Sequence, residues 1–480
     1  MKVLIVETNP VKPHLETAAE LAFRFSENKK NIVKFAWLGN DLPWSEWQIP
    51  DFLKVIGLSY FKRIKIIEQI LRDKNIDIIN SNKFIINSTT SLKQWSTSFN
   101  GNIRDLINFK YKNFFLGKGV ASSLISYYRD ENLNLSKIKN VSNLLLSSAI
   151  VLERCIKLFK IEKPDCVITF NSRFATTLPI ILAAKYFSIK VLRHERGSNF
   201  KKFEIFKRDV HDYDYIISEV YRYWRNAPKS KRDLIAKNYF LKRRNNKAIG
   251  INVGFLYTKL QKKKFYQLCK KKRLIVYYTS TDYEQIAINN NFDQEKKFNI
   301  LYSIISKMKD TDLIIRVHPD LYGKNYIEDK KWAKYSSANT KVIFSNDKTD
   351  TYKLMDIADI VVSFSSNILI ESVFWGKNTV SLSDGMIYSK ANLCLFPKNF
   401  SDYKKIFATN FIFKKVNKNK ALPFGYYFEN FGREFKYYEP INYYNGSLVG
   451  RKTDWKPKII SLLEYLKIKK IYNYLYIKLK

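Results

Sequence analysis

A histidine followed by proline, and a pair of serines, are the residues whose types and positions first suggest chemistry. His318-Pro319 follows the apolar run 313–317, and Ser365-Ser366 follows the apolar run 360–364. A helix is expected to begin directly after the serines, so their hydroxyls and its first free amides would line one small pocket. Together with the histidine, this pattern predicts a cradle for a nucleotide phosphate. Alternatively, Pro319 only ends the strand and His318 bonds to backbone.

A glutamate with arginines on both sides forms a second candidate. Glu195 lies between Arg193 and Arg196, and Gly197 follows. The glycine would let the backbone approach a ligand, and the carboxylate would then act as a general base in a cleft. The alternative is a buried ion pair that holds the turn, and the residues alone favour neither.

Other polar residues also lie at the expected ends of strands or at the starts of helices. His14 and Glu16 are close together at a helix start, where they would hold sugar hydroxyls, or would simply cap the helix and face solvent. The remaining candidates of this kind are Asn171, Arg173, Thr279, Ser280, Glu284 and Arg316.

Short apolar runs alternate with longer segments of helical character along much of the chain. The expected strands are residues 3–6, 273–278, 313–317, 342–344, 360–364 and 379–382. The expected helices include about 15–25, 296–307 and 367–375. Such alternation predicts parallel strands joined by crossover helices, an α/β fold whose ligands bind at the carboxyl ends of the strands. The loop after the first strand has no GxGxxG, so the dinucleotide fingerprint is absent.

The length of 480 residues predicts two domains, because one core rarely grows so large. We expect an N-terminal α/β domain at 1–245, a basic connection at 246–272 and a second α/β domain at 273–455. Residues 456–480 form a basic amphipathic pattern, which predicts a helix that lies on an anionic membrane or packs on the protein. No run is long and apolar enough to span a bilayer.

The chain carries 84 basic and 44 acidic residues, a net charge of +40. This charge indicates an anionic partner, or else a general bias toward lysine. Because the basic residues are spread along the chain without a recognition motif, specific binding of nucleic acid is not expected. The four cysteines are scattered, with no CxxC, so neither a metal site nor a disulfide framework is expected and a reducing cytoplasm fits.

In its motifs the chain resembles bacterial capsule and surface-polysaccharide glycosyltransferases of the GT-B type, a group that includes Kdo transferases, sialyltransferases and polysialyltransferases. The sialyltransferase-like enzymes have an acidic-acidic-Gly motif, a His-Pro motif and a Ser/Thr pair. Here Glu195-Arg196-Gly197, His318-Pro319 and Ser365-Ser366 match them in the same order. Arg196 stands where a second acid is usual, which counts against sialic acid as the sugar. The match touches both halves and is densest at 274–384.

The resemblance implies a role for each matching residue. Glu195 would deprotonate the acceptor hydroxyl, His318 would contact the donor phosphate, and the serine pair would hold that phosphate. Glu371 resembles the GT-B glutamate that binds the donor ribose. The full expected donor side is Ser280, Arg316, His318, Pro319, Ser365, Ser366 and Glu371, and the acceptor side is His14, Glu16, Asn171, Arg173 and Arg196.

These expectations combine into one hypothesis. The fold would be GT-B-like, with two doubly wound Rossmann-like domains that face a cleft. The reaction would be an inverting, metal-independent sugar transfer from a nucleotide-sugar, a CMP-sugar being favoured, to a polysaccharide or glycolipid acceptor. No cofactor is expected, and the enzyme would be cytoplasmic, in peripheral contact with the inner face of the membrane. The alternatives are a CDP-polyol phosphotransferase resembling teichoic-acid polymerases, a nucleotide-sugar epimerase, and a noncatalytic scaffold at the membrane.

Overall fold

The computed structural model describes most of the chain. The described residues are 1–11, 13–45, 54–79, 84, 90–128, 130, 132–138, 140–245, 272–281, 293–321, 326–442 and 446–453. The predicted connection, apart from Lys272, lies outside these residues, as do the predicted C-terminal helix and Glu284.

The N-terminal half is built on a sheet with the strand order β12-β6-β5-β4-β1-β2-β3. Its strands are β1 (Lys2–Glu7), β2 (Ile32–Trp37), β3 (Asp77–Ile79), β4 (Cys166–Phe170), β5 (Lys190–Arg196), β6 (Lys202–Phe206) and β12 (Arg433–Glu434). β1 to β5 are parallel to one another, whereas β6 and β12 are antiparallel to their neighbours. The apolar run of β1 is buried throughout because helices cover both faces of the sheet.

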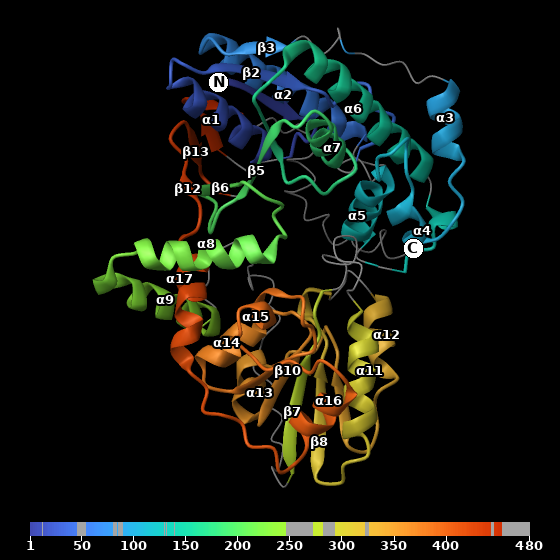
Figure 1. Cartoon of the computed structure of the whole chain (residues 1–480), viewed down its shortest axis with the longest axis vertical. Coiled ribbons are helices and arrows are strands. Elements are labelled where there is room, and N and C mark those ends of the chain that lie inside the picture. Colours follow the sequence, from blue (N-terminus) through green and yellow to red (C-terminus); the bar gives the residue numbers. More distant parts are fainter. Residues whose placement is uncertain are drawn as a thin grey trace, which may run out of the picture.

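Helices cover this sheet in two layers (Figure 1). α1 (His14–Ser26) and α2 (Lys54–Asp73) pack on one face, and α6 (Val141–Glu162) and α7 (Leu178–Tyr186) pack on the other. α3 (Thr90–Thr97) and α5 (Leu116–Tyr128) pack on α6, and α4 (Ile103–Asn108) packs on α5. α8 (Tyr213–Asn226) and α9 (Lys229–Arg244) follow β6. The strands therefore present their polar ends at the edges of a covered sheet.

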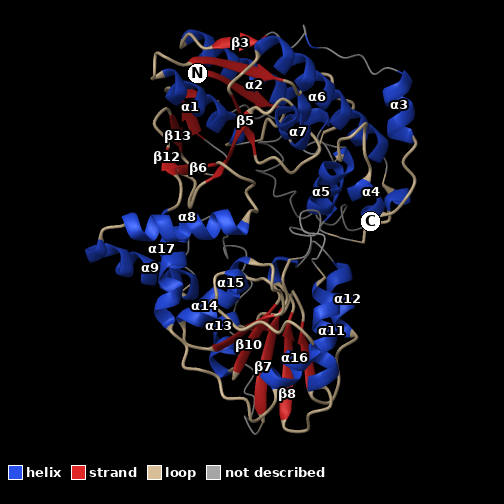
Figure 2. Ribbon diagram, viewed as in Figure 1, coloured by secondary structure: helices blue, strands red, loops and turns tan. Residues whose placement is uncertain are grey.

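The second half contains a five-stranded parallel sheet with the order β11-β10-β7-β8-β9 (Figure 2). Its strands are β7 (Arg273–Tyr278), β8 (Thr311–Arg316), β9 (Thr340–Ile343), β10 (Ile360–Ser363) and β11 (Asn378–Ser381). Its helices are α11 (Gln294–Ile305), α12 (Tyr326–Ala333), α13 (Thr351–Ile357), α14 (Ile368–Phe374), α15 (Ile387–Lys390) and α16 (Phe400–Phe407). The prediction of an α/β chain with two Rossmann-like domains is confirmed.

Both sheets reverse their strand order at an equivalent place. β1 lies beside β4 in the first sheet, and β7 lies beside β10 in the second. In an open α/β sheet, the crevice at such a reversal, outside the carboxyl ends of the strands, is the usual place for a ligand. The two reversal points are therefore the first places in which to look for a site.

The chain returns to the N-terminal half after its second sheet. α17 (Leu422–Asn430) packs on α8 and α9, and β12 pairs with β6. β13 (Tyr438–Pro440), β14 (Gly446–Leu448) and β15 (Arg451–Lys452) form a small antiparallel sheet, and Tyr438 and Leu448 join the core around α1. The end of the predicted domain 273–455 therefore packs on the N-terminal half. The sequence did not indicate this, because these strands are too short and irregular to show a period.

One buried carboxylate anchors the returning segment. Glu20, in the middle of α1, has no exposed side-chain surface, and its oxygens accept hydrogen bonds from three consecutive backbone amides. These amides belong to Lys436, Tyr437 and Tyr438, at distances of 2.8, 2.7 and 2.9 Å. Arg24 also pairs with Glu20, at 2.5 Å. The carboxylate therefore supplies the hydrogen-bond acceptors that the carbonyls of a neighbouring strand would otherwise supply to residues 436–438.

Glu20→Ala should destabilise the protein because it leaves three backbone amides and the Nε of Arg24 without their acceptor. We expect a loss of about 3 kcal/mol in the free energy of unfolding, measured by urea denaturation. Glu27→Ala is the control, since exposed Glu27 also contacts Lys436 and Tyr437. Equal effects of the two substitutions would contradict the anchoring role.

Candidate functional site

Hydroxyl groups gather at the reversal point of the second sheet. Ser280 follows β7 and Ser363 ends β10, and their Oγ atoms lie 3.3 Å apart. Ser363 donates to the carbonyl of Tyr278 at 2.7 Å, and the amide of Ser280 donates to Gln294 at 2.6 Å. Both serines are buried. These two serines lie beneath the edge of the sheet at which the predicted donor residues are found.

The predicted pair, Ser365 and Ser366, contacts these two buried serines directly. The amide of Ser365 donates to Ser280 Oγ at 2.8 Å, and the amide of Ser366 donates to Ser363 Oγ at 3.3 Å. The pair is half-buried. α14 begins at Ile368, whose amide lies 3.5 Å from Ser366 Oγ. The two serine amides are thus already paired, so a ligand here would meet the serine hydroxyls rather than a row of free amides.

His318 lies on the neighbouring strand end. Its amide donates to Thr279 Oγ1 at 2.9 Å, which places it one residue from Ser280 across the sheet. Its side chain is half-buried, and Pro319 starts a short 3₁₀ turn, Pro319–Leu321. Proline therefore does end the strand, as one interpretation held. The amide contact with Thr279 places the residue at the edge of the sheet that carries the serines.

Two other predicted donor residues are engaged elsewhere. The buried guanidinium of Arg316 donates to the carbonyls of Phe344 and Asp347, the latter at 3.1 Å, so it fixes the loop after β9. Buried Glu371 accepts from Arg243 Nε at 2.7 Å and from the hydroxyl of Tyr352. These contacts give both side chains a structural role, and their contacts with a donor stay predictions.

At the first sheet, Glu195 lies beside the reversal point. Asn171 Nδ2 donates to its Oε2 at 2.6 Å, and the amide of Arg196 donates to its Oε1 at 2.9 Å. The amide of Asn171 also donates to the carbonyl of His194, at 3.1 Å. Glu195 is half-buried, so its carboxylate is oriented by the protein yet still reachable from solvent. The structure thus brings together Glu195 and Asn171, two of the predicted residues.

A buried acid–imidazole pair lies next to Glu195 and was not predicted. Glu7 Oε1 and His194 Nε2 are 2.6 Å apart, and neither side chain is exposed. Because β4 lies between β1 and β5, this pair ties two strands across a third. Burial raises the pKa of Glu7, while His194 and the amide of Phe170 work in the opposite direction. The one sequence signal for this pair was Glu7 itself, an acidic residue at the end of the apolar run 3–6.

The two residues predicted at the start of α1 have different surroundings. His14 is buried with its ring 3.7 Å from that of Phe170 and 6.5 Å from that of His194, so it belongs to the reversal point. Glu16 is also buried, but it pairs with Arg63, whose Nε lies at 3.1 Å, and accepts from Thr453 at 2.8 Å. Glu16 therefore holds α1 to α2 and to the returning chain.

The arginines of the acceptor side are less clearly directed. The guanidinium of Arg173 lies over the ring of Phe174, at 4.6 Å from its centroid. Burial, together with the charge of Arg173, lowers the pKa of His211 to about 3. Arg196 is close enough to His14 to lower the pKa of that imidazole. Positive charge therefore lies on both sides of the strand ends that carry Asn171 and Glu195.

The loop that orients Glu195 is strained. Asn171 and Ser172 both have left-handed backbone angles, with φ values of 50° and 98°. Non-glycine residues rarely adopt such angles, and they occur mainly where the surrounding structure enforces them, often at functional sites. Here the strain turns the chain sharply enough for Asn171 to reach Glu195.

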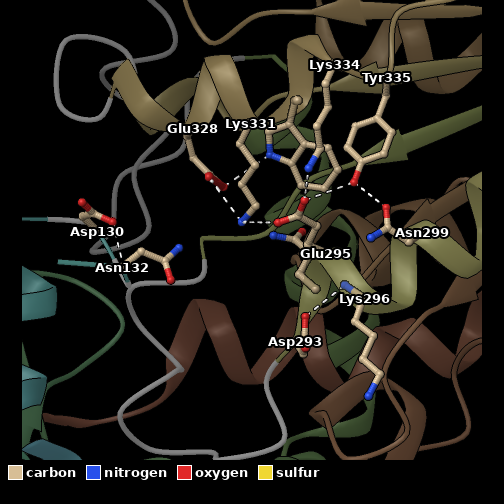
Figure 3. Close-up of polar contacts among 12 residues, drawn as sticks. Asp130, Asn132, Asp293, Glu295, Lys296, Asn299, Glu328, Lys331, Lys334 and Tyr335 are labelled. Atoms are coloured by element: carbon tan, nitrogen blue, oxygen red, sulfur yellow. Dashed lines mark hydrogen bonds and ion pairs between the residues drawn. The ribbon is translucent and has the colours of Figure 1, made fainter. Parts of the chain in front are cut away.

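A cavity of about 510 Å³ opens on the surface of α11, and it is lined by Asp293, Glu295, Lys296, Asn299, Ile300 and Ser303. Figure 3 shows its surroundings, where Glu295 lies among Lys331, Lys334 and Tyr335. Lys331 also lies 3.5 Å from Glu328. Glu295 and Glu328 are thus paired with lysines, Asp293 caps α11 by accepting from the amide of Lys296, and we assign this open cavity no chemistry.

Within the described ranges, no helix is long and apolar enough to cross a membrane. The same residues hold no cluster of three or more His, Cys, Asp or Glu side chains suited to a metal ion.

No protein-family model matches the sequence, and no curated protein matches it. Similar solved structures include the KpsC β-Kdo 2,4 transferase of Thermosulfurimonas dismutans, with 14% identity, 54% of this chain and 78% of that chain covered, and a TM-score of 0.38. The UDP-GlcNAc 2-epimerase of Neisseria meningitidis, bound to UDP-GlcNAc, is 14% identical, with 90% of this chain and 97% of that chain covered and a TM-score of 0.29. At these scores the likenesses carry no conclusion about activity.

Glycine at position 172 should suit the left-handed backbone better than any residue with a Cβ. Ser172→Ala loses only the hydroxyl, which lies 3.3 Å from Arg193 Nε, whereas Ser172→Gly loses the hydroxyl and the strain. We expect Ser172→Gly to be more stable than Ser172→Ala by about 1 kcal/mol in urea unfolding. An alanine variant as stable as the glycine variant would show that the loop is not strained.

The buried imidazole of His14 should make stability depend on pH. Burial, with the charges of Arg196, His194 and Arg63, lowers its pKa well below the ordinary 6.5. The unfolded chain therefore takes up a proton below about pH 6.5 that the folded chain refuses, so stability falls as the pH falls.

We expect this loss to approach 1.4 kcal/mol per pH unit for His14 alone. His14→Gln, which cannot be protonated, should show a shallower decline between pH 6.5 and 5 in urea unfolding. Parallel curves for the two proteins would contradict the assignment.

Proposed function

We propose that the protein is a glycosyltransferase that moves a sugar from a nucleotide-sugar, a CMP-sugar being favoured, to a growing capsular or surface polysaccharide. The observation that carries the proposal is the hydrogen bond from Asn171 to Glu195, which orients a reachable carboxylate at the reversal point of one sheet. The hydroxyl-lined edge with His318 at the other sheet supports a phosphate-binding half. The motif resemblance supplies the sugar chemistry.

In the proposed reaction, Glu195 removes the proton from an acceptor hydroxyl. The oxygen attacks the anomeric carbon from the side opposite the nucleotide, and the bond from that carbon to the phosphate oxygen breaks. The configuration inverts and the nucleotide leaves with the bonding electrons. His318 and the hydroxyls of Ser365 and Ser366 stabilise the charge that develops on the leaving phosphate.

The same proposal sets the partners. The donor nucleotide is bound at the second sheet without a metal ion, and no cofactor takes part. The acceptor is a polysaccharide or glycolipid that reaches Glu195, Asn171 and the neighbouring arginines. The enzyme works in the cytoplasm, in peripheral contact with the inner face of the membrane where such acceptors are made, and nucleic acid is not a partner.

A thermal-shift screen tests the donor half, because a ligand that binds only the folded state raises the melting temperature. CMP, CDP, UDP, GDP and ADP are compared with and without Mg²⁺. Stabilisation by CMP without metal is the expected result. A response to UDP or GDP alone would overturn the CMP assignment, and no response to any nucleotide would overturn the transferase.

Glu195→Gln should abolish turnover and leave nucleotide binding nearly unchanged, because the amide cannot accept the acceptor proton. We expect kcat for release of nucleotide from the donor found in the screen to fall by about 100-fold or more. His318→Ala should weaken nucleotide binding by about tenfold, through loss of a charge-assisted hydrogen bond.

The control for the first variant is Glu439→Gln, which neutralises an exposed carboxylate on β13. It should retain full activity. Normal turnover of Glu195→Gln would rule out Glu195 as the base, and unchanged nucleotide affinity of His318→Ala would place the phosphate elsewhere.

A further inference from the structure

One face of α9 packs against the rest of the protein. Ala236, Tyr239 and Phe240 are buried, and the ring of Phe240 stacks on that of Phe374 from α14 at 4.1 Å. α17 packs along the same face. Arg243, near the end of α9, adds its ion pair with Glu371. The helix is thus held firmly between the two halves of the molecule (Figure 1).

The opposite face of α9 carries apolar and basic side chains into solvent. Leu234 is 63% exposed and Leu241 is 42% exposed. They are seven residues apart, two turns of helix, so both lie on one side with Lys231 and Lys237 beside them. Among the helical side chains whose burial the structure describes, no other helix has two large apolar side chains that are exposed.

Positive charge is concentrated along α9 and the end of α8, beyond the general bias of the chain. Residues 222–244 contain nine basic side chains and one acidic side chain, whereas the whole chain of 480 residues carries +40. Four of the basic side chains in α9 are paired, namely Arg232, Lys242, Arg243 and Arg244. The ammonium groups of Lys229, Lys231 and Lys237 have no ion-pair partner within the described part of the chain. A local excess this large is not explained by overall composition.

We propose that the outward face of α9 lies on an anionic membrane surface. Leu234 and Leu241 enter the boundary between headgroups and acyl chains, and Lys231 and Lys237, which flank them on the helix, pair with lipid phosphates. Basic helices with an exposed apolar stripe bind interfaces by this combination. Nucleic acid would use the lysines but gives the two leucines nothing to bury, so the leucines favour a membrane.

The surface is distinct from the amphipathic pattern predicted at 456–480, which lies outside the described residues. A test on the full chain must therefore separate the two. Substitutions in α9 leave the terminal segment unchanged, so a loss of binding on such substitution belongs to α9. The inference does not depend on the proposed transferase, because its readout is binding to lipid.

The experiment is co-sedimentation of the full chain with vesicles of 7:3 phosphatidylcholine and phosphatidylglycerol, and with phosphatidylcholine alone. We expect binding to the anionic vesicles, weakened about tenfold by Leu234→Ser with Leu241→Ser, because two buried apolar side chains are lost. Lys231→Gln with Lys237→Gln should weaken it further, by about fivefold for each charge. Melting temperatures should stay unchanged, since these side chains are exposed.

Ile161→Ser is the matched control, because Ile161 on α6 is 61% exposed and lies between Lys160 and Lys163. It should bind as the wild type does. A photo-crosslinking benzoylphenylalanine in place of Leu234 should form lipid adducts, and one in place of Ile161 should not. Unchanged vesicle binding of the leucine variant, or lipid adducts at neither position, would overturn the proposal. So would α9 lysine variants that lose RNA binding while vesicle binding is kept.

Discussion

Parallel pairing is the constraint from which the rest of the structure follows. Strands that run in one direction need crossover helices, so each sheet collects the loops after its strands at a single edge. Where β1 meets β4 and where β7 meets β10, successive helices lie on opposite faces and the loops part. Residues distant in sequence, such as Glu7 and His194 or Ser280 and Ser363, come together there because of topology.

Charges buried between elements join these two sheets into one molecule. The carboxylate of Glu371 links α14 to α9 through Arg243, and Glu20 holds the returning chain through three amides. A buried charge is costly unless it is paired, so each link favours one arrangement of its elements over looser ones. Loss of one partner would leave an unpaired charge in the interior. The pairing thus resists the sliding of α9 on α14, beyond what the apolar contacts alone provide.

The sequence predicted the elements that have strong local patterns. β7 was predicted with its observed bounds, and His318, Ser365 and Asn171 were placed correctly at strand ends. The periods of strands and helices are local, so such elements can be inferred residue by residue. The pairing of β12 with β6 could not be inferred in this way, because a two-residue strand shows no period. Nor could the partners of Glu16, since Arg63 and Thr453 are brought to it only by the fold.

The same limit explains why charged candidates were the hardest to assign. A glutamate looks the same in a sequence whether its side chain contacts solvent, a ligand or an arginine. Glu195 begins one matched motif and Glu371 follows another, yet Glu371 is buried against Arg243 and Tyr352 while Glu195 is only half-buried. The difference lies in what faces each carboxylate from another element. Both carboxylates accept hydrogen bonds on each of their oxygens, so burial separates them: Glu371 is buried and would have to give up Arg243 or Tyr352 to bind a ribose, whereas half-buried Glu195 can be reached by an acceptor while Asn171 still holds it.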